Sequence, residues 1–413
     1  MHALATTVIA IATTIAPCTA HGQEVMLLQS SDGVSPRVTG MAVDAKLICG
    51  VVDTGGRSGW QAAIWDDQGH GVWTHLTTYG VQDRVCTGLS PNGRFAVGYN
   101  QYDPIKQCGG AMYWDRDTAT PFCLPQTWSG KANAITSDGR TIAGSDMDQA
   151  ILWIDGQRYV LGTSTFHSET TSLTSDGSAA VGYLASSYEV CDAFVWNRDY
   201  GLSILPTFGS GANASAMAIS ADGSVIVGYC GWLYNGWLVR WTRDSSTGEY
   251  VIERLGTDDQ TTLFSFGYPA AAVSPDGSVI AGSLARPAPD GSYMSEAVLW
   301  TQRTGLTPVS GWLQDVPYGY ALLDVRGVAS DNRTLAGNGQ FVDENGAYRD
   351  SLGWLATLPC PSDFNRSGFV DTEDFDSFVR AFEEGIPEAD FDGSGFVDTE
   401  DYDAFVSAFQ AGC

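Results

Sequence analysis

Two segments near the end of the chain, 363–374 and 390–401, repeat one spacing of oxygen-bearing side chains. These side chains stand at positions one, three, five, nine and twelve of each segment, with glycine at position six. Ca²⁺ is bound by hard oxygen ligands around such a sharp turn, together with the backbone carbonyl of position seven. The sequence therefore predicts two calcium ions, held by Asp363, Asn365, Ser367, Phe369, Asp371 and Asp374 and by Asp390, Asp392, Ser394, Phe396, Asp398 and Asp401.

Acidic charge is concentrated in this part of the chain. Residues 360–413 contain 14 Asp and Glu against two Arg, a net charge of −12, while the whole chain carries −27. A solvated acidic tail without any ion is the alternative, but random acids would not repeat twice in register. Position five is Ser and position twelve is Asp in both loops. Each loop thus has fewer charges than a cytosolic buffer site and should bind calcium more weakly.

Each loop is followed by apolar residues at helical spacing. They are Phe375, Phe378, Val379 and Phe382 after the first loop, and Tyr402, Phe405, Val406 and Phe409 after the second. Such spacing places apolar side chains on one face of a helix. We therefore expect two loop–helix units that pack together across a pseudo-twofold axis, with no helix before the first loop.

This duplicated loop with a single following helix resembles a dockerin. The opening Cys360-Pro361 and the ending Gly412-Cys413 resemble the dockerin variant of secreted planctomycete proteins. The resemblance covers residues 360–413 and implies attachment to a cohesin-like or cell-surface protein. Dockerin residues at loop positions ten and eleven help to select that partner. The resemblance assigns this role to Thr372, Glu373, Thr399 and Glu400, which form the same pair in both copies.

The body of the chain consists of seven copies of one unit. A glycine that ends an apolar strand recurs at Gly50, Gly98, Gly144, Gly182, Gly228, Gly282 and Gly337. A tryptophan follows at Trp65, Trp114, Trp153, Trp196, Trp241, Trp300 and Trp354. A turn residue precedes the glycine at Asp44, Asn92, Asp138, Asp176, Asp222, Asp276 and Asp331. Asp-Gly and Asn-Gly provide the positive φ of a tight hairpin, and the flanking runs alternate at period two.

Each unit predicts four short strands, and a repeat of about 45 residues is typical of a propeller blade. We predict an all-β, seven-bladed propeller over residues 21–359, followed by a small all-α calcium-binding domain over 360–413. The first strand of each copy is rich in small residues, which suits the crowded centre of a ring, and the tryptophans should pack between blades. The last copy lacks a fourth strand. We expect Val25 to Leu28 to complete the seventh blade and close the ring.

The repeat resembles the extracellular repeats of the HAF type. The segments Ile219 to Gly228 and Ala193 to Trp196 match the pattern of that family, and the resemblance covers roughly residues 35–358. It implies an extracellular setting and no particular reaction. A WD-repeat or sialidase-like propeller is the alternative.

Residues 1–20 are interpreted as a signal peptide, because a short apolar run precedes the small-x-small site Cys18-Thr19-Ala20. The mature chain should be secreted or displayed at the cell surface. No other apolar run is long enough to span a membrane. Eight cysteines remain, an even number that suits disulfides in an oxidising compartment. The proposed pairs are Cys49–Cys86, Cys108–Cys123, Cys191–Cys230 and Cys360–Cys413.

The acidic chain has no basic stripe, which excludes nucleic acid as a partner. Aromatic residues gather in the loops between the second and third strands of each copy. They could stack on a glycan or grip a protein, and ordinary loop packing is the alternative. The candidate ligand-binding residues are Tyr188, Tyr229, Trp232 and Tyr234.

Catalytic patterns are absent from the sequence: it has no His-Glu-x-x-His and no nucleophile elbow. The expected channel strands are almost free of Asp and Glu, so no catalytic residues are assigned. These features favour a non-catalytic propeller that binds a ligand or has a structural or adhesive role. The alternative is a carbohydrate-active enzyme, a glycosidase or a lyase, with the same tail. Two carboxylates close together in a central pocket would favour the enzyme, and an apolar, filled channel the binder.

Overall fold

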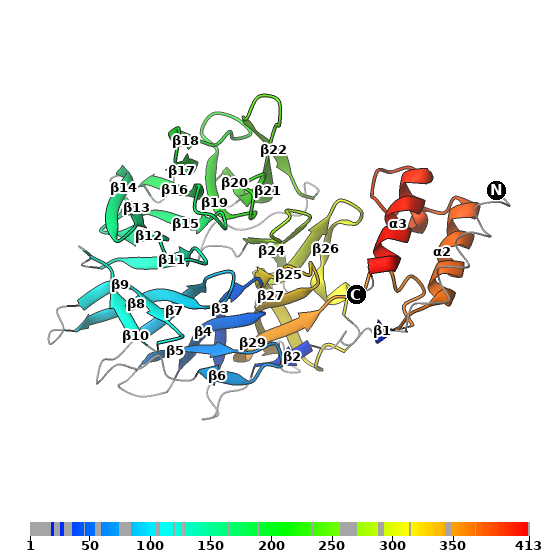
Figure 1. Cartoon of the computed structure of the whole chain (residues 1–413), viewed down its shortest axis with the longest axis horizontal. Coiled ribbons are helices and arrows are strands. Elements are labelled where there is room, and N and C mark those ends of the chain that lie inside the picture. Colours follow the sequence, from blue (N-terminus) through cyan, green and yellow to red (C-terminus); the bar gives the residue numbers. More distant parts are fainter. Residues whose placement is uncertain are drawn as a thin grey trace.

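A computed structural model describes residues 18–19, 25–28, 35–44, 46–53, 59–73, 84–103, 108–118, 120–125, 127, 129–163, 166–187, 190–232, 235–256, 271–287, 293–313, 315–342, 348–367 and 369–411. Seven four-stranded antiparallel sheets form a ring, and two helices follow it (Figure 1). The predicted all-β, seven-bladed propeller is confirmed. Within the described residues neither helix has the length and apolar character needed to cross a membrane.

The blades follow one another along the chain. Blade 1 contains β3 (Pro36–Ala42), β4 (Leu47–Asp53), β5 (Trp60–Trp65) and β6 (Gly71–Trp73). Blade 2 contains β7 (Arg84–Leu89), β8 (Phe95–Asp103), β9 (Cys108–Asp115) and β10 (Thr120–Cys123). Blade 3 contains β11 (Lys131–Ile135), β12 (Thr141–Asp146), β13 (Gln149–Ile154) and β14 (Gln157–Thr163). Blades 4 and 5 are β15 (Ser168–Leu173), β16 (Ala179–Ser187), β17 (Val190–Asn197) and β18 (Gly201–Ile204); and β19 (Asn213–Ile219), β20 (Val225–Trp232), β21 (Asn235–Arg243) and β22 (Tyr250–Arg254). Blade 6 is β23 (Ala271–Val273), β24 (Val279–Pro287), β25 (Tyr293–Thr301) and β26 (Gly305–Pro308), after which comes the short helix η1 (Val309–Gly311).

The seventh blade joins the two ends of the propeller. It contains β27 (Tyr320–Val328), β28 (Thr334–Val342) and β29 (Tyr348–Thr357), and its outer strand is β2 (Val25–Leu27). Val25 pairs with Ala356 and Leu27 with Trp354 in antiparallel register. The expected closure of the ring by this early strand is therefore confirmed, and Figure 1 shows β2 beside β29.

The recurring glycine is required by the shape of the first strand. In six blades the first strand carries an extra residue opposite the second strand, which produces a register shift. A Cβ at Gly50 would lie 1.8 Å from the carbonyl oxygen of Arg37, and one at Gly228 would lie 2.0 Å from that of Ser215. No side chain fits in this space, so the glycine marks the strand distortion as well as the repeat.

The turn after the first strand is held by side chains. In blade 5 the Ser220 hydroxyl donates to Asp222 (2.8 Å) and accepts from the N–H of Val225 (3.0 Å), while Asp222 accepts from the N–H of Ser224 (2.9 Å). The intervening Gly223 has φ +75°. The same hydroxyl-to-carboxylate or hydroxyl-to-amide bond occurs at Ser90, Thr136, Thr174 and Ser274.

The tryptophans pack between blades, as expected. Trp241 is fully buried in a cluster that joins β17 of blade 4 to β19 and β20 of blade 5. Its indole N–H donates to the carbonyl of Pro206 (2.8 Å). Trp65, Trp153 and Trp354 are buried in the same way in other blades. Each blade interface thus contributes its own apolar core.

Beyond the propeller lie β30 (Phe369–Val370), α2 (Thr372–Glu384), η2 (Pro387–Ala389) and α3 (Thr399–Ala411). The rings of Phe378 and Phe405, which are equivalent in the two copies, stack with centroids 3.9 Å apart. Phe364 and Phe391, another equivalent pair, each meet both of these rings edge-on. The two loop–helix units therefore pack as a pseudo-twofold pair. Of residues 1–20, only β1 (Cys18–Thr19) is described, and it pairs with β30.

Candidate functional site

The second loop brings three carboxylates together. Oxygens of Asp390, Asp392 and Asp401 lie within 4.8 Å of one another. Asp401 is buried in the first turn of α3 and accepts from the N–H groups of Asp392 (2.9 Å) and Asp398 (2.8 Å). Burial would raise the pKa of Asp401, but these N–H donors outweigh it, so the pKa lies below its ordinary value. The carboxylate is therefore ionised and fixed in orientation.

One oxygen of this group has no partner. Asp390 Oδ2 accepts from the N–H of Gly395 (2.9 Å), but its Oδ1 is buried and has no hydrogen bond from any described residue. A buried carboxylate oxygen without a partner is costly in free energy. A cation among the three carboxylates would remove that cost. The donor set, all oxygen around a turn with Gly395 at φ +90°, fits a metal ion.

The first loop repeats the geometry with one acid fewer. Asp374 accepts from the N–H groups of Asn365 (2.9 Å) and Asp371 (3.0 Å), and Asp363 accepts from Ser367 (2.8 Å). Burial raises the pKa of Asp374, and repulsion from the carboxylates of Asp363 and Asp371 raises it further. Together these effects outweigh the two N–H donors, which lower the pKa. Because position three is Asn365, the described part of this loop does not gather three acidic oxygens as the second loop does.

The remaining predicted ligand positions are also ordered. The hydroxyls of Ser367 and Ser394 each lie 3.2 Å from the position-seven carbonyl, that of Phe369 or Phe396. Position nine caps the following helix in both copies. Asp371 accepts from the N–H of Glu373 (2.8 Å), and Asp398 accepts from that of Glu400 (3.1 Å). The position-nine carboxylates thus hold the helix starts beside the loops.

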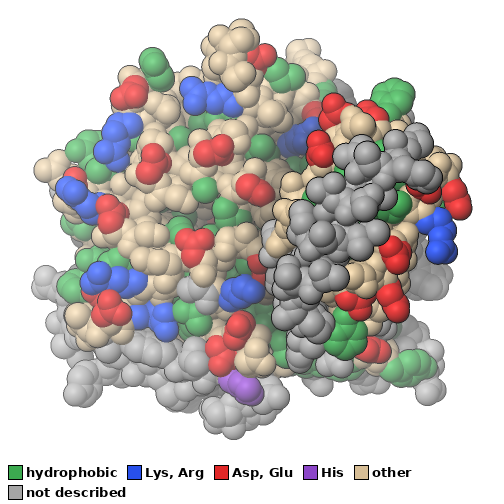
Figure 2. All heavy atoms as spheres, turned by 45° about the vertical axis from the view of Figure 1, so that its right-hand side comes forward, with side chains coloured by type: hydrophobic (Ala, Val, Ile, Leu, Met, Phe, Trp, Pro, Cys, Tyr) green, Lys and Arg blue, Asp and Glu red, His purple; other side chains and the backbone are tan. Residues whose placement is uncertain are grey.

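The residues at loop positions ten and eleven are accessible. Thr372, Glu373, Thr399 and Glu400 are all exposed in the first turns of α2 and α3. In the second copy the Thr399 hydroxyl donates to the Glu400 carboxylate (3.0 Å). Acidic side chains are spread over the tail and the neighbouring blades in Figure 2, while the basic side chains in that view lie mainly over the propeller.

The propeller contacts the second loop through Arg303, in the turn between β25 and β26. Its guanidinium donates to the carbonyl of Glu388 (2.8 Å) and lies over the ring of Phe391, 5.2 Å from the centroid. A Cβ at Gly393 would lie 2.7 Å from the Arg303 backbone nitrogen. The first loop has Arg366 at the equivalent position four. The second loop is therefore shaped for blade 6, beside which the tail lies in Figure 1.

A cavity of about 1170 Å³ lies at the centre of the ring, lined by first strands from all seven blades. In each blade the repeat glycine of the second strand pairs with one residue of the first strand. We call the residue just before that partner the ring position. The described members are Arg37, Val85, Lys131, Glu169, Ser215 and Asp324. Four of these six are charged. The expectation of channel strands almost free of acids is wrong at Glu169 and Asp324, which line the cavity beside small residues of the same strands.

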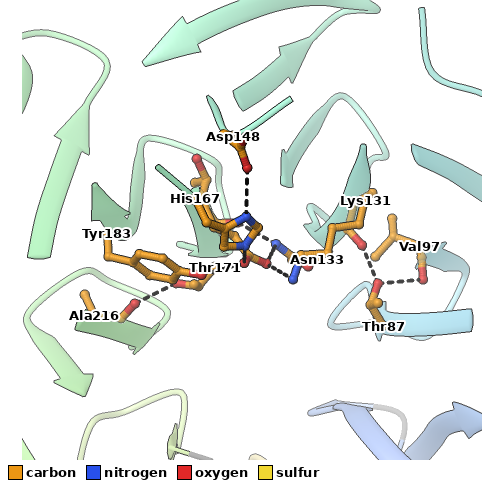
Figure 3. Close-up of polar contacts among 12 residues, drawn as sticks. Thr87, Val97, Lys131, Asn133, Asp148, His167, Thr171, Tyr183 and Ala216 are labelled. Carbon is orange, nitrogen blue, oxygen red and sulfur yellow. Dashed lines mark hydrogen bonds and ion pairs between the residues drawn. The ribbon is translucent and has the colours of Figure 1, made fainter. Parts of the chain in front are cut away.

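Glu169 is the centre of a polar network between blades 3 and 4, and its partners Lys131, Asn133, His167 and Tyr183 are labelled in Figure 3. Its Oε1 accepts from Lys131 (2.6 Å) and Asn133 (2.7 Å), and its Oε2 accepts from the Tyr183 hydroxyl (2.8 Å). His167 Nε2 lies 3.2 Å from Oε2. Burial would raise the pKa of Glu169, but Lys131 and the other donors lower it to about 2.

His167 bridges two carboxylates. Its imidazole Nδ1 lies 3.5 Å from Asp148 (Figure 3), while its Nε2 faces Glu169. The hydrogen bond to Glu169 raises the pKa of His167, although burial acts against it. The imidazolium form is therefore favoured. An ionised Glu169 with four polar partners cannot donate a proton and has little freedom to act as a nucleophile.

Asp324 holds the equivalent ring position in blade 7. Its Oδ2 accepts twice from Arg326 (2.8 and 3.0 Å), and its Oδ1 accepts from the backbone and side chain of Asn338 (2.8 and 3.1 Å). Asn338 also bonds the backbone of Val38 in blade 1, which ties the last blade to the first. Asp324 and Glu169 are thus each neutralised by a cation.

Arg37 differs from the other charged ring positions. Its guanidinium lies 5.2 Å from the centroid of the Trp60 ring, and no described carboxylate forms an ion pair with it. The side chain is exposed and lines the cavity, together with Trp60 and Tyr99. This leaves a cation beside aromatic rings in blades 1 and 2. Sequence reasoning missed it because Arg37 precedes the small-residue part of its strand.

The predicted aromatic ligand site is largely outside the described residues. Tyr188, Tyr234 and the side chain of Trp232 lie outside the described part of the chain. Tyr229 is fully buried between blades 5 and 6, with its hydroxyl 3.5 Å from the carbonyl of Ser283. Its assignment as a ligand-binding residue is wrong, because it belongs to the inter-blade core.

Two of the predicted disulfides are not formed. Cys49 and Cys86 are free and buried between blades 1 and 2, and Cys191 and Cys230 are also free. They lie within strands and pack as small apolar residues, and burial raises the pKa of Cys191 to about 12. Cys123 and Cys360 are disulfide-bonded. Their partners lie outside the described side chains, so pairing with Cys108 and Cys413 stays a prediction.

Comparison with known proteins shows the fold alone. No family model matches the chain, and no curated protein matches it. An oligogalacturonate lyase in complex with manganese is similar in structure, with TM-score 0.51 and 14% identity over 81% of this chain and 97% of that one. The β-propeller domain of the Trilobed protease from Pyrococcus furiosus, described as having an open velcro topology, gives 0.50 and 10% over 79% and 98%. At these identities the chain shares a propeller fold with enzymes and with protein domains of other roles.

Proposed function

We propose that this chain is a secreted, non-catalytic, ligand-binding propeller attached to a cohesin-like or cell-surface protein through a calcium-dependent, dockerin-like tail. One observation carries the proposal. The second loop places three carboxylates within 4.8 Å and leaves a buried oxygen of Asp390 without a hydrogen-bond partner among the described residues. Calcium is the metal whose oxygen-rich shell and loop spacing match this arrangement.

The tail has the form of an attachment module. Its two units pack through equivalent phenylalanines, and its four predicted recognition residues are exposed. Two disulfide-bonded cysteines, one in each part of the chain, support an oxidising, extracellular setting. The resemblance of the body to extracellular repeats agrees with the same setting.

The channel supports binding rather than catalysis. A hydrolase needs a carboxylic acid that can give up its proton near neutral pH. The pKa of Glu169 is about 2, and Asp324 is bonded twice to Arg326. The two acids belong to blades 4 and 7, across the ring from each other. The apolar, filled channel expected for a binder is not found, because the cavity is open and its lining includes charged residues; this open space has room for a ligand.

The attachment is tested with the full chain and intact cell envelopes of its source. We expect retention in millimolar calcium and release by a chelator. Asp390→Asn, which keeps the size of the side chain, should weaken retention, and the matched change Asp403→Asn on the exposed face of α3 should not. Replacing Thr372, Glu373, Thr399 and Glu400 together by alanine should abolish retention with calcium binding intact. Equal retention with and without calcium would contradict the proposal.

A carbohydrate-active enzyme is the second candidate. The observation that favours it is the pair Lys131 and Glu169 on the wall of a cavity of this size, with His167 bonded to Glu169. An oligogalacturonate lyase is among the proteins with this fold. Release of new reducing ends from polysaccharides, lost in His167→Gln, would establish the enzyme in place of the binder.

A further inference from the structure

The cavity has an excess of positive charge in a chain that carries −27. Its charged lining residues are Arg37, Lys131, Arg326, Glu169 and Asp324. The two acids are bonded to Lys131 and Arg326, so their charge is compensated locally. Arg37 has no described carboxylate as a partner. A free anion is repelled by the chain as a whole but attracted here.

The cations are arranged around one arc of the ring. Arg37 and Lys131 hold the same ring position in blades 1 and 3, with the neutral Val85 of blade 2 between them. The Lys131 ammonium makes one ion pair, with Glu169, and its side chain is 30% exposed. An ammonium has three donors, so Lys131 can bind a second oxygen without leaving Glu169.

Flat apolar surface lies beside these cations. Trp60 lies under the Arg37 guanidinium, and Tyr99 is the next aromatic residue around the cavity wall. Across the channel, blades 5 and 6 contribute Met217, Ala271 and Ala272. A sugar ring has an apolar face that stacks on aromatic rings and an edge of hydroxyls. The amides of Asn133 and Gln340, also on the wall, suit such hydroxyls.

We propose that the channel binds an acidic oligosaccharide, with its carboxylates at Arg37 and Lys131 and a sugar face on Trp60. This deepens the proposed ligand-binding role and rests on it. The cavity of about 1170 Å³ has room for a few sugar units. A carboxylate suits both the planar fork of Arg37 and the ammonium of Lys131. Glu169 and Asp324 act as positioning residues, because they hold Lys131 and Arg326 at the wall.

The test is calorimetric titration of the full chain with a trimer of galacturonic acid and, as a matched probe, its neutral methyl ester. We expect the acid to bind and the ester to bind at least tenfold more weakly. Arg37→Gln should weaken binding of the acid about tenfold or more, the usual effect of losing a charge-assisted hydrogen bond. Arg140→Gln removes the same charge from an exposed pair with Asp155, at the turn between β12 and β11, and should have no effect.

A third probe, a short polyglutamate peptide, presents carboxylates without sugar rings. Trp60→Leu should weaken binding of the acidic trimer, and melting curves will show that each variant is folded. The proposal is overturned if the acid does not bind, if the ester binds equally well, if Arg37→Gln leaves the affinity unchanged, or if the peptide binds in place of the sugar. These titrations do not involve the tail, so their failure is distinct from failure of calcium-dependent attachment.

Discussion

Gly393→Arg should release the tail from the propeller without removing a calcium ligand. The substitution makes position four of the second loop identical to Arg366 of the first, which adopts φ +59° without glycine. The loop itself can therefore accept an arginine. Blade 6 cannot, because a Cβ at this position would lie 2.7 Å from the nitrogen and 2.8 Å from the Cα of Arg303.

The size of the effect follows from the contacts that must separate. The hydrogen bond from Arg303 to the carbonyl of Glu388 is charge-assisted and contributes about 1.5–3 kcal/mol. The guanidinium over Phe391 contributes about 0.5–1 kcal/mol at a partly exposed site. Together they give about 2–4 kcal/mol of docking free energy. Losing about 3 kcal/mol shifts the docking equilibrium roughly a hundredfold.

Hydrogen exchange and small-angle scattering of the full chain measure this change. We expect faster exchange in the Gln302–Gly305 turn and a larger radius of gyration for Gly393→Arg. Arg366→Gly, the reverse exchange in the first loop, should change neither. The stoichiometry of calcium binding should be the same in both variants. Unchanged exchange and unchanged dimensions in Gly393→Arg would refute the assignment of this contact.

Three further predictions concern the propeller. Glu169→Gln should lower the free energy of unfolding by about 3 kcal/mol at pH 7, because the pKa of Glu169 in the folded protein, about 2, lies below its ordinary value of 4.5. This contribution to stability is present above pH 4.5 and is lost as the pH falls toward 2. The melting curves of the two proteins should therefore converge in acid. Gly228→Ala should destabilise blade 5 by about 2–4 kcal/mol in chemical denaturation, because the alanine methyl would lie 2.0 Å from the Ser215 carbonyl oxygen. The control Gly209→Ala should leave the stability unchanged, because a methyl there would meet no atom within 4 Å. Thiol titration in denaturant without reductant, followed by peptide mapping, should find Cys49, Cys86, Cys191 and Cys230 reactive, and blocked thiols at these positions would restore the disulfides predicted from sequence.

The blades and the ring closure were predictable because they follow from local rules. The Asp-Gly turns and the recurring glycine mark strand pairs inside each unit, and a missing fourth strand required a partner elsewhere in the chain. Val25 to Leu27 filled that place. The arrangement of the two tail loops was equally predictable, because the spacing of their oxygen side chains is a property of one short segment that occurs twice; that the ion is calcium stays a prediction.

The channel and the cysteines depended on contacts between distant units. Lys131 and Glu169 are far apart in sequence and meet only because blades 3 and 4 are neighbours in the ring. The repeat pattern drew attention to the small residues after them, such as Ala134 and Ser172, which line the same cavity. Cys49 and Cys86 were expected at strand ends on one face, but both lie inside strands. Cys49 directly precedes the repeat glycine Gly50, and Cys86 pairs with the repeat glycine Gly98. A local signal for the contact between the tail and blade 6 was the glycine at position four of the second loop, Gly393, where the first loop has Arg366.

The proposed attachment depends on calcium binding at the two loops of the tail. Isothermal titration of the chelator-treated full chain with CaCl₂ tests it most directly. We expect two ions per chain, and one ion for Asp390→Asn, because that variant replaces the carboxylate whose buried Oδ1 accepts no hydrogen bond within the part of the chain that the structure describes. Absence of binding at millimolar calcium, or a stoichiometry unchanged by Asp390→Asn, would contradict the account.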